Sequence, residues 1–291
     1  MSVEPLISVV VPVHNGAAYL SDSLESVVAQ THRRLDIVVV DDGSTDESAA
    51  MIRAWASRDA RVRPIVTSHR GPEHARNAGV AAAHGDFIAH LDQDDIAAPA
   101  RLSTQYRWMH THGVDVCGSC TLVFGEHRYV RWVPERHADI LREFVFRPAM
   151  IHSTTLLPAS IAKTHPFCED LQSGGYDLLT RLALRYQLGN VPQVLLKYRR
   201  HAGQRSHINA DAVLADGRRI RRRYFAALFP DATAADHAAV ACVADGVPFT
   251  GTAEMELAAA WMRRLSETGD THLRSLMADR WAAARRRGSP E

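Results

Sequence analysis

The sequence is poor in the features that define several common classes of protein. It has 4 cysteines among 291 residues, and its 34 Lys and Arg balance 33 Asp and Glu to a formal net charge of +1. So small a net charge gives too weak a field to hold a phosphate backbone, and we expect no general binding of nucleic acid. The longest apolar runs fall far short of the roughly 20 residues that span a bilayer, so no transmembrane helix is expected. The N-terminus, with Glu4 and no apolar core, is not expected to act as a secretion signal.

The few cysteines are also spread unevenly along the chain. This argues against the disulfide framework of a secreted protein and favours a reducing cytoplasm. Cys117 and Cys120 form a C-x-x-C pair, but they lie in a β-like run, Val114–Phe124, and no second pair of Cys or His follows at zinc spacing. We therefore interpret them as buried strand cysteines rather than as a metal or redox site.

Strand and helix patterns alternate through the first 100 residues. Apart from Ser8, the run 7–13 is apolar and rich in Val, as a strand buried on both faces should be. Further strands are predicted at 36–40, 62–66 and 86–91, and helices at 20–28, 49–55 and 73–83. Strand and helix in strict alternation predict an α/β fold around a mostly parallel sheet.

Polar residues follow the predicted strands at the points where they end. His14-Asn15 follows the first strand, Asp41-Asp42 the second, and Asp92–Asp95 a later one. Ligands of open α/β sheets bind beyond the carboxyl ends of the strands. One such cluster is most simply a solvated loop, but three of them together predict a functional edge.

Asp92 and Asp94 form a D-x-D pair at one of these strand ends. This spacing projects both carboxylates to the same side, and carboxylate oxygens are the ligands that Mg²⁺ and Mn²⁺ prefer. Such an ion makes a diphosphate a better leaving group, because it neutralises the charge that develops there. The pair therefore indicates a metal–diphosphate site.

Beyond residue 106 the pattern becomes irregular, apart from a predicted helix at 178–186 and a strand at 191–198. Helical periodicity returns after residue 210, over 213–229, 234–244, 253–265 and 273–286. The segment Arg218–Arg223 is strongly basic. We interpret it as a solvated helix face, with contact to anionic lipid or an acidic partner as the alternative.

Several of these segments resemble the family 2 glycosyltransferases of the GT-A fold, and the resemblance covers roughly residues 5–207. The matching stretches are ISVVVPVHN (7–15), IVVVDDGSTD (37–46), ARNAG (75–79), FIAHLDQDD (87–95), PARL (99–102), YDLLTRL (176–182) and YRRH (198–201). The resemblance implies a Rossmann-like α/β/α sandwich with a nucleotide-sugar-binding half, 1–105, and an acceptor-binding half, 106–209. Residues 210–291 would form a helical C-terminal extension.

The resemblance also implies roles for individual residues. Asp42 would accept a hydrogen bond from the base, most often uracil, and Arg76 would lie near the base or the diphosphate. Asp92 would face the ribose, while Asp94 and His201 would ligate Mn²⁺ or Mg²⁺. The nucleotide pocket would be lined by Pro12, Val13, His14 and Asn15, with His14 where similar enzymes often carry a stacking Tyr.

The sequence departs from the family where the catalytic base is expected. Inverting members usually carry Glu-Asp directly before the Tyr-Asp-Leu segment, and that Asp takes the proton of the acceptor hydroxyl. Here the two positions are Gly174-Gly175. Three explanations stay open: Asp177, or the pair Glu169 and Asp170, acts as base; Glu169-Asp170 is itself the expected pair, followed by an insertion; or the protein binds donor without efficient transfer.

We therefore expect a metal-dependent glycosyltransferase that moves a sugar from a nucleoside-diphosphate sugar, most simply a UDP-sugar, to a hydroxyl of a glycan or lipid-linked acceptor. Inversion and a role in surface polysaccharide assembly at the cytoplasmic face of the membrane are what the family implies. The alternatives are a non-catalytic nucleotide-sugar-binding or scaffold protein and a nucleotidyltransferase. The second is disfavoured because no Lys or Arg follows the first strand before His32-Arg33.

Overall fold

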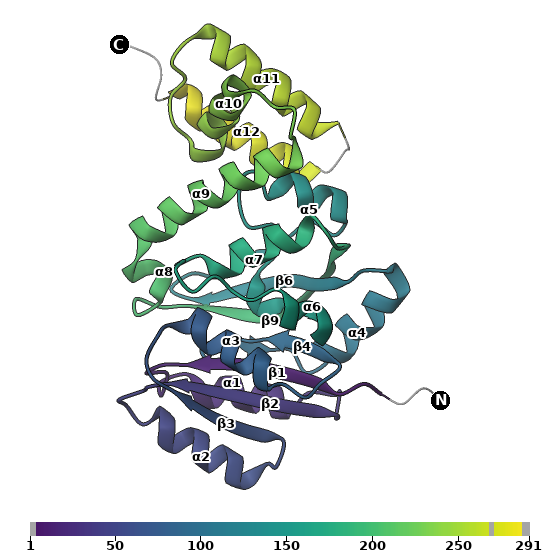
Figure 1. Ribbon diagram of the computed structural model, residues 1–291, viewed down its shortest axis with the longest axis vertical. Coiled ribbons are helices and arrows are strands. Elements are labelled where there is room, and N and C mark those ends of the chain that lie inside the picture. Colours follow the sequence, from purple (N-terminus) through teal and green to yellow (C-terminus); the bar gives the residue numbers. More distant parts are fainter. Residues whose placement is uncertain (1–3, 268–270, 287–291) are drawn as a thin grey trace.

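Across residues 4–267 and 271–286, which the computed structural model describes, the chain forms one nine-stranded sheet covered by helices (Figure 1). The strands lie in the order β3-β2-β1-β4-β8-β6-β9-β5, and β7 pairs with β6 beside this path. Their bounds are β1 (Ile7–Val13), β2 (Leu35–Asp42), β3 (Val62–Thr67), β4 (Phe87–His90), β5 (Ile96–Ala97), β6 (Val116–Gly125), β7 (Tyr129–Arg131), β8 (Leu156–Pro158) and β9 (Leu188–Arg200).

The first half of the sheet is parallel. β1 pairs in parallel with both β2 and β4, and β2 pairs in parallel with β3. Successive side chains of a strand point to opposite faces, so Val9 of β1 packs in the core with α1 (Leu20–Val28) and α2 (Ser48–Arg58), while Val10 packs with α3 (Pro72–Ala82). Because helices cover both faces, all of β1 is buried. The alternation predicted from the sequence is confirmed.

The second half of the sheet is mixed and brings a distant segment to the acidic turn, residues 92–95. β8 lies antiparallel between β4 and β6, and β6 runs parallel to the long strand β9. β5 begins directly after the acidic turn and pairs with β9, with Ile96 opposite Lys197. The end of β9 and the residues that follow it therefore lie beside the acidic turn.

The region 106–175, which the sequence left irregular, is built of mostly short elements. They are the end of α4 (Arg101–His112), β6, β7, α5 (His137–Glu143), the 3₁₀ turn η1 (His152–Thr154), β8 and α6 (Ala159–Thr164). Elements of three to seven residues are too short to show a clear period. Cys117 and Cys120 are free and buried in β6, which confirms their interpretation as strand cysteines.

Helices cover one face of the sheet and continue beyond it. They are α7 (Gly174–Ala183), α8 (Arg205–Ile208), α9 (Ala210–Leu228), α10 (Ala234–Asp245), α11 (Thr252–Ser266) and α12 (Thr271–Arg286). α9 packs on α7, and α10 to α12 form the end of the molecule farthest from β2 and β3 (Figure 1). The helices predicted after residue 210 are confirmed. In the part of the chain that the structure describes, none of them combines the length and the apolarity needed to cross a bilayer.

Arg101, at the start of α4, is fully buried and links α4 to the end of β4. Its guanidinium donates to the carbonyl oxygen of His90 at 2.8 Å and to the side chain of Gln105 at 3.1 Å. Burial lowers the pKa of Arg101 to about 10, so the group stays charged at neutral pH. A buried cation with several acceptors is costly to remove, since those acceptors are then left without a donor.

We expect Arg101→Met to lower the free energy of unfolding by about 3 kcal/mol, because buried acceptors lose their donor. Urea denaturation followed by circular dichroism measures this. Arg107→Met, at an exposed position of the same helix, is the matched control and should change stability by less than about 0.5 kcal/mol. Equal losses of unfolding free energy in the two variants would contradict the role of Arg101.

Candidate active site

Three parallel strands end at one edge of the sheet, and the polar residues that follow them lie together there. His14 follows β1, Asp42 ends β2, and the acidic turn follows β4. The His14 amide donates to the Gln93 side chain at 2.9 Å, and His14 Nδ1 lies 2.9 Å from the carbonyl oxygen of Asp42. The prediction that the three polar clusters meet at one edge is therefore confirmed.

Asp42 is 1% exposed, and its carboxylate organises the loop that follows β3. It accepts hydrogen bonds from the Thr67 hydroxyl at 3.0 Å and from the backbone amides of Arg70 and Gly71 at 3.1 and 2.8 Å. His69 Nδ1 lies 3.1 Å from the same carboxylate. Burial acts to raise the pKa of Asp42, but the two amide donors outweigh it and the net shift is downward.

Two imidazole rings form a stacked pair over the end of β2. The rings of His14 and His69 lie 3.9 Å apart at 20° to each other. The His69 side chain is 59% exposed, so the pair presents a flat surface at the mouth of the site. His69 could not be identified from the sequence, because it lies in a loop outside the recognised motifs.

The other residues expected to line the nucleotide pocket differ in exposure. Pro12 and Val13 are buried within β1, whereas Asn15 is exposed. Asn15 has φ of 48°, in the left-handed region, where Asn is better tolerated than most residues. Its side-chain oxygen accepts from the Thr45 amide at 2.8 Å and its amide donates to Ser44 at 3.0 Å, so it fixes the loop after β2.

The first carboxylate of the acidic turn is paired with an arginine. Arg76 of α3 donates to Asp92 Oδ1 at 2.7 Å and is 8% exposed. His152 of η1 lies near the same carboxylate, with its Nε2 atom 3.7 Å from Asp92 Oδ1. Burial acts to raise the pKa of Asp92, but its neighbours His152 and Arg76 outweigh burial and lower it. Asp92 is therefore ionised at neutral pH.

The second carboxylate of the turn meets the segment that follows β9. Asp94 Oδ2 lies 3.0 Å from His201 Nε2 and 3.4 Å from Gln204 Nε2. Burial and the nearby charge of Asp92 raise the pKa of Asp94. The structure thus brings together the two residues expected to ligate a metal, although 107 positions separate them in sequence.

The donor set at Asp94 and His201 fits a divalent cation. A buried carboxylate with a raised pKa is stabilised by added positive charge, and carboxylate oxygen with imidazole nitrogen suits Mn²⁺ and, less well, Mg²⁺. No group of three or more His, Cys, Asp or Glu side chains within 4–267 and 271–286 is arranged as a complete metal cage. Two protein ligands would leave coordination positions for phosphate oxygens and water, as is usual for Mg²⁺ at phosphate sites.

The third carboxylate of the turn holds the site together. Asp95 is fully buried and accepts from the Arg199 amide at 3.0 Å and from the Ser153 hydroxyl at 2.9 Å. Arg199 also donates to the carbonyl oxygen of Asp94 at 2.9 Å. These bonds tie the end of β9 and the turn η1 to the acidic turn.

Glu73 of α3 extends this network away from the acidic turn. It is 3% exposed and pairs with Arg76 at 3.3 Å and with Arg205 of α8 at 2.5 Å. Arg205 also donates to the Gln172 side chain at 2.8 Å. A chain of alternating charges therefore runs from Asp92 to the segment that carries His201. Neither Glu73 nor Arg205 was recognised from the sequence, because their relation is purely tertiary.

Asp177, one of the carboxylates considered as base, lies in ion pairs on α7. It is 2% exposed, with one oxygen 2.8 Å from Arg181 and the other 2.5 Å from Arg223 of α9. These contacts join α7 to α9 and account for the buried charge. The structure does not bring Asp177 into any of the contacts described for the acidic turn.

The other two carboxylates considered as base lie on the loop before α7. Glu169 contacts Arg70 of the loop before α3 at 3.0 Å, and His74 and Asn77 of α3 at 3.2 and 3.1 Å. Hydrogen bonding to Asn77 is the largest cause that lowers the pKa of Glu169. Asp170 is exposed beside it.

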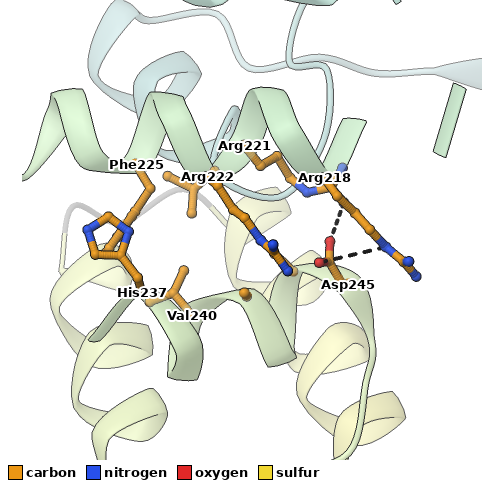
Figure 2. Close-up of a pocket in the computed structure, with 10 residues that line it drawn as sticks. Arg218, Arg221, Arg222, Phe225, His237, Val240 and Asp245 are labelled. Atoms are coloured by element: carbon orange, nitrogen blue, oxygen red, sulfur yellow. Dashed lines mark hydrogen bonds and ion pairs between the residues drawn. The ribbon is translucent and has the colours of Figure 1, made fainter. Parts of the chain in front are cut away.

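The basic segment of α9 lines a hollow between α9 and α10. Arg218 and Arg221 both pair with Asp245 at the end of α10 (Figure 2). His237 lies at the other side of the same hollow, and Arg222 is exposed between them. The interpretation as a solvated helix face therefore holds for Arg222 but not for the two arginines that fasten α9 to α10.

Comparison with known proteins defines the class to which this fold and site belong. The sequence model of Glycosyl transferase family 2 matches residues 8–168, more than half of the chain. The chain belongs to this family and is a glycosyltransferase. An uncharacterized glycosyltransferase of Haemophilus influenzae is 26% identical over 225 residues, which cover 70% of this chain and 68% of that protein. Glycosyltransferase GlyG of Streptococcus pneumoniae is 38% identical over 112 residues, 38% of this chain and 37% of that protein.

Solved structures confirm the GT-A fold. Residues 1–349 of TarS from S. aureus, in complex with UDP-GlcNAc, match with a TM-score of 0.63 and 18% identity over 97% of this chain and 82% of that one. The mannosyltransferase PcManGT from Pyrobaculum calidifontis, in complex with GDP-Man and Mn²⁺, matches with a TM-score of 0.60 and 21% identity over 97% of this chain and 81% of that one.

We expect Asp42→Asn to lower the free energy of unfolding by about 2 kcal/mol at neutral pH, because hydrogen bonds to an ionised acceptor are lost. The pKa of Asp42 is lower in the folded chain than the value near 3.9 of an unfolded one. Its stabilisation is thus present above about pH 4 and is lost as the pH falls through the folded pKa. Urea denaturation of both proteins over this range should show the difference shrinking in acid; a constant difference would contradict this account.

Proposed function

We propose that the protein is a metal-dependent glycosyltransferase that moves a sugar from a nucleoside-diphosphate sugar, in particular a UDP-sugar, to a hydroxyl of a glycan or lipid-linked acceptor. The observation that carries the proposal is the meeting of Asp94 and His201 at 3.0 Å, beside the Asp92–Arg76 pair. TarS was solved with UDP-GlcNAc and PcManGT with GDP-Man and Mn²⁺, and both share this fold, which supports the donor class.

The contacts at the strand ends support a position for the nucleotide. A base stacks on the His14–His69 pair, whose flat surface is partly exposed. Asp42 accepts a hydrogen bond from the base at the carboxylate oxygen that His69 Nδ1 also contacts, so the His14–His69 stack stays in place. Asn15 and the end of β1, with Pro12 and Val13, form the wall of this pocket.

The sugar and diphosphate then lie over the acidic turn. Asp92 accepts from the ribose, and Arg76 adds positive charge near the diphosphate, where its donors match phosphate oxygens. Asp94 and His201 hold Mn²⁺ or Mg²⁺. When bound, the cation neutralises the charge that develops on the leaving diphosphate. Attack of the acceptor hydroxyl on the opposite side of the anomeric carbon gives inversion.

For the acceptor and its setting we propose surface polysaccharide assembly at the inner face of a bacterial membrane. The relatives described above come from bacteria, and Arg222 on α9 is an exposed cation that suits an anionic lipid surface. A non-catalytic nucleotide-sugar-binding protein is the second candidate, because Gly174 and Gly175 stand where the family carries its base. Release of UDP from UDP-sugars over many turnovers separates the two candidates.

We expect Asp94→Ala to weaken Mn²⁺-dependent binding of UDP by about 100-fold, because the cation loses a charged ligand. Titration calorimetry of UDP with and without Mn²⁺ measures this. Asp86→Asn, which changes an exposed aspartate at the opposite end of β4, is the control and should bind as the unaltered protein does. Equal affinity for UDP in Asp94→Ala and in the unaltered protein, both with Mn²⁺, would count against the metal site.

A further inference from the structure

The start of α7 leaves no room for side chains at two consecutive positions. A Cβ atom on Gly174 would lie 2.5 Å from Cγ of Glu73, and one on Gly175 would lie 2.8 Å from Cβ and Cγ of His152. Contacts this short are not tolerated between packed atoms, so glycine is required at both positions while Glu73 and His152 keep their places. These two side chains therefore fill the space in which the sequence led us to expect a carboxylate pair.

Of these two side chains, His152 has a nitrogen without a partner. Its Nε2 is buried and makes no hydrogen bond, and it lies 3.7 Å from Asp92 Oδ1. Glu73, in contrast, has both oxygens in ion pairs, with Arg76 and Arg205. Both oxygens of Glu73 are therefore occupied, and His152 is the one of the two side chains that has an unpaired nitrogen.

The protonation state of His152 suits a proton acceptor. Burial, with the nearby charges of Arg76 and Arg101, lowers the pKa of His152 to about 4, while Asp92 acts in the opposite direction. The ring of His90 also lies near, with its centroid at 5.9 Å. The imidazole of His152 is therefore neutral at physiological pH and has a lone pair to offer.

The two ring nitrogens face different groups. Nε2 points toward Asp92, whose charge stabilises a proton on that nitrogen. Nδ1 lies beside Gly175, where a Cβ atom would stand 3.1 Å away. Any larger residue at position 175 would cover Nδ1, so glycine keeps this nitrogen open.

We propose that His152 is the general base of the transfer reaction, with Nδ1 as the accepting atom and Asp92 as the group whose charge stabilises the protonated ring. This rests on the proposed function. The acceptor oxygen forms a bond to the anomeric carbon, and the bond from that carbon to the diphosphate breaks with its electron pair on the diphosphate. The acceptor proton passes to Nδ1, and the imidazolium is compensated by Asp92 until it releases the proton to water. A carboxylate that orients and stabilises a histidine base is a recurring arrangement in enzymes.

The first test is the loss of the base. His152→Ala should lower turnover of UDP-sugars with Mn²⁺, assayed as UDP release to water, by about 100-fold, the usual effect of removing a general base. Calorimetric affinity for UDP with Mn²⁺ should change by less than about threefold, since the base acts on the acceptor and not on the nucleotide. His84→Ala, at an exposed histidine of the segment before β4, is the control and should turn over at the unaltered rate.

The second test replaces the histidine base with a carboxylate at position 175. In His152→Ala the space beside position 175 is free, so adding Gly175→Asp places a carboxylate there. We expect this double variant to regain at least about tenfold of the lost turnover. Gly175→Asp alone, with His152 in place, should lose both turnover and stability, because its Cβ meets the imidazole.

The outcomes distinguish a failure of the proposed base from a failure of the proposed function. If the unaltered protein binds no UDP with Mn²⁺, the proposed function fails. If UDP is bound and turned over but His152→Ala keeps its rate, while Glu169→Gln or Asp170→Asn loses it, the loop carboxylates provide the base and His152 does not. A third readout does not depend on donor: ¹⁵N NMR of labelled histidines, assigned with His152→Gln, should show the proton of His152 on Nε2. A proton on Nδ1 overturns the proposal.

Discussion

The structure of the active site depends on how three aspartates within four residues of the acidic turn are compensated. Negative charge at this density is tolerated in a buried position only when each group has donors or cations of its own. Asp92 has Arg76, and Asp95 has the Arg199 amide and the Ser153 hydroxyl. The Asp94 carboxylate has His201 and Gln204, but no arginine or lysine of the described residues donates a hydrogen bond to it. Of the three carboxylates, Asp94 is therefore the one that a bound cation would stabilise most.

The same compensation holds together parts of the chain that are far apart in sequence. Asp95 fixes the end of β9, which places His201 against Asp94. A series of ion pairs links Asp92 to Arg76, Arg76 to Glu73, and Glu73 to Arg205. Arg205 lies in the segment after His201, so these pairs also hold that segment in place. The candidate active site is therefore not a separate feature added to the fold. It is the place at which the parallel and mixed halves of the sheet are joined.

The amino-terminal half of this arrangement could be predicted from the sequence. Strands such as 7–13 are apolar at nearly every position, and the helices between them have a clear period. The edge with His14, Asp42 and the acidic turn therefore followed from the order of elements. The pairing of Asp94 with His201 came from resemblance alone. No local pattern reports a contact between residues 107 positions apart.

The surroundings of His152, on the proposed acceptor side, could not be predicted from the sequence for physical reasons. His152 lies in a 3₁₀ turn of three residues, within a region of short elements that have no period. Asp177 was a reasonable candidate by its place beside the motif, yet its surroundings are set by Arg223, which comes from another helix. At Gly174 and Gly175 the sequence indicates only the loss of a carboxylate pair. The packing of Glu73 and His152 against the two glycines shows which side chains fill that space.

The central claim is that Asp94 and His201 hold a cation on the diphosphate of the donor. Crystals grown with UDP and Mn²⁺, measured at the manganese absorption edge, test it most directly. The account predicts an anomalous peak in bonding distance of Asp94, His201 and the diphosphate oxygens, with the base of UDP against His14 and His69. A peak bound by other residues, or UDP bound at this edge with no manganese beside it, would contradict the account.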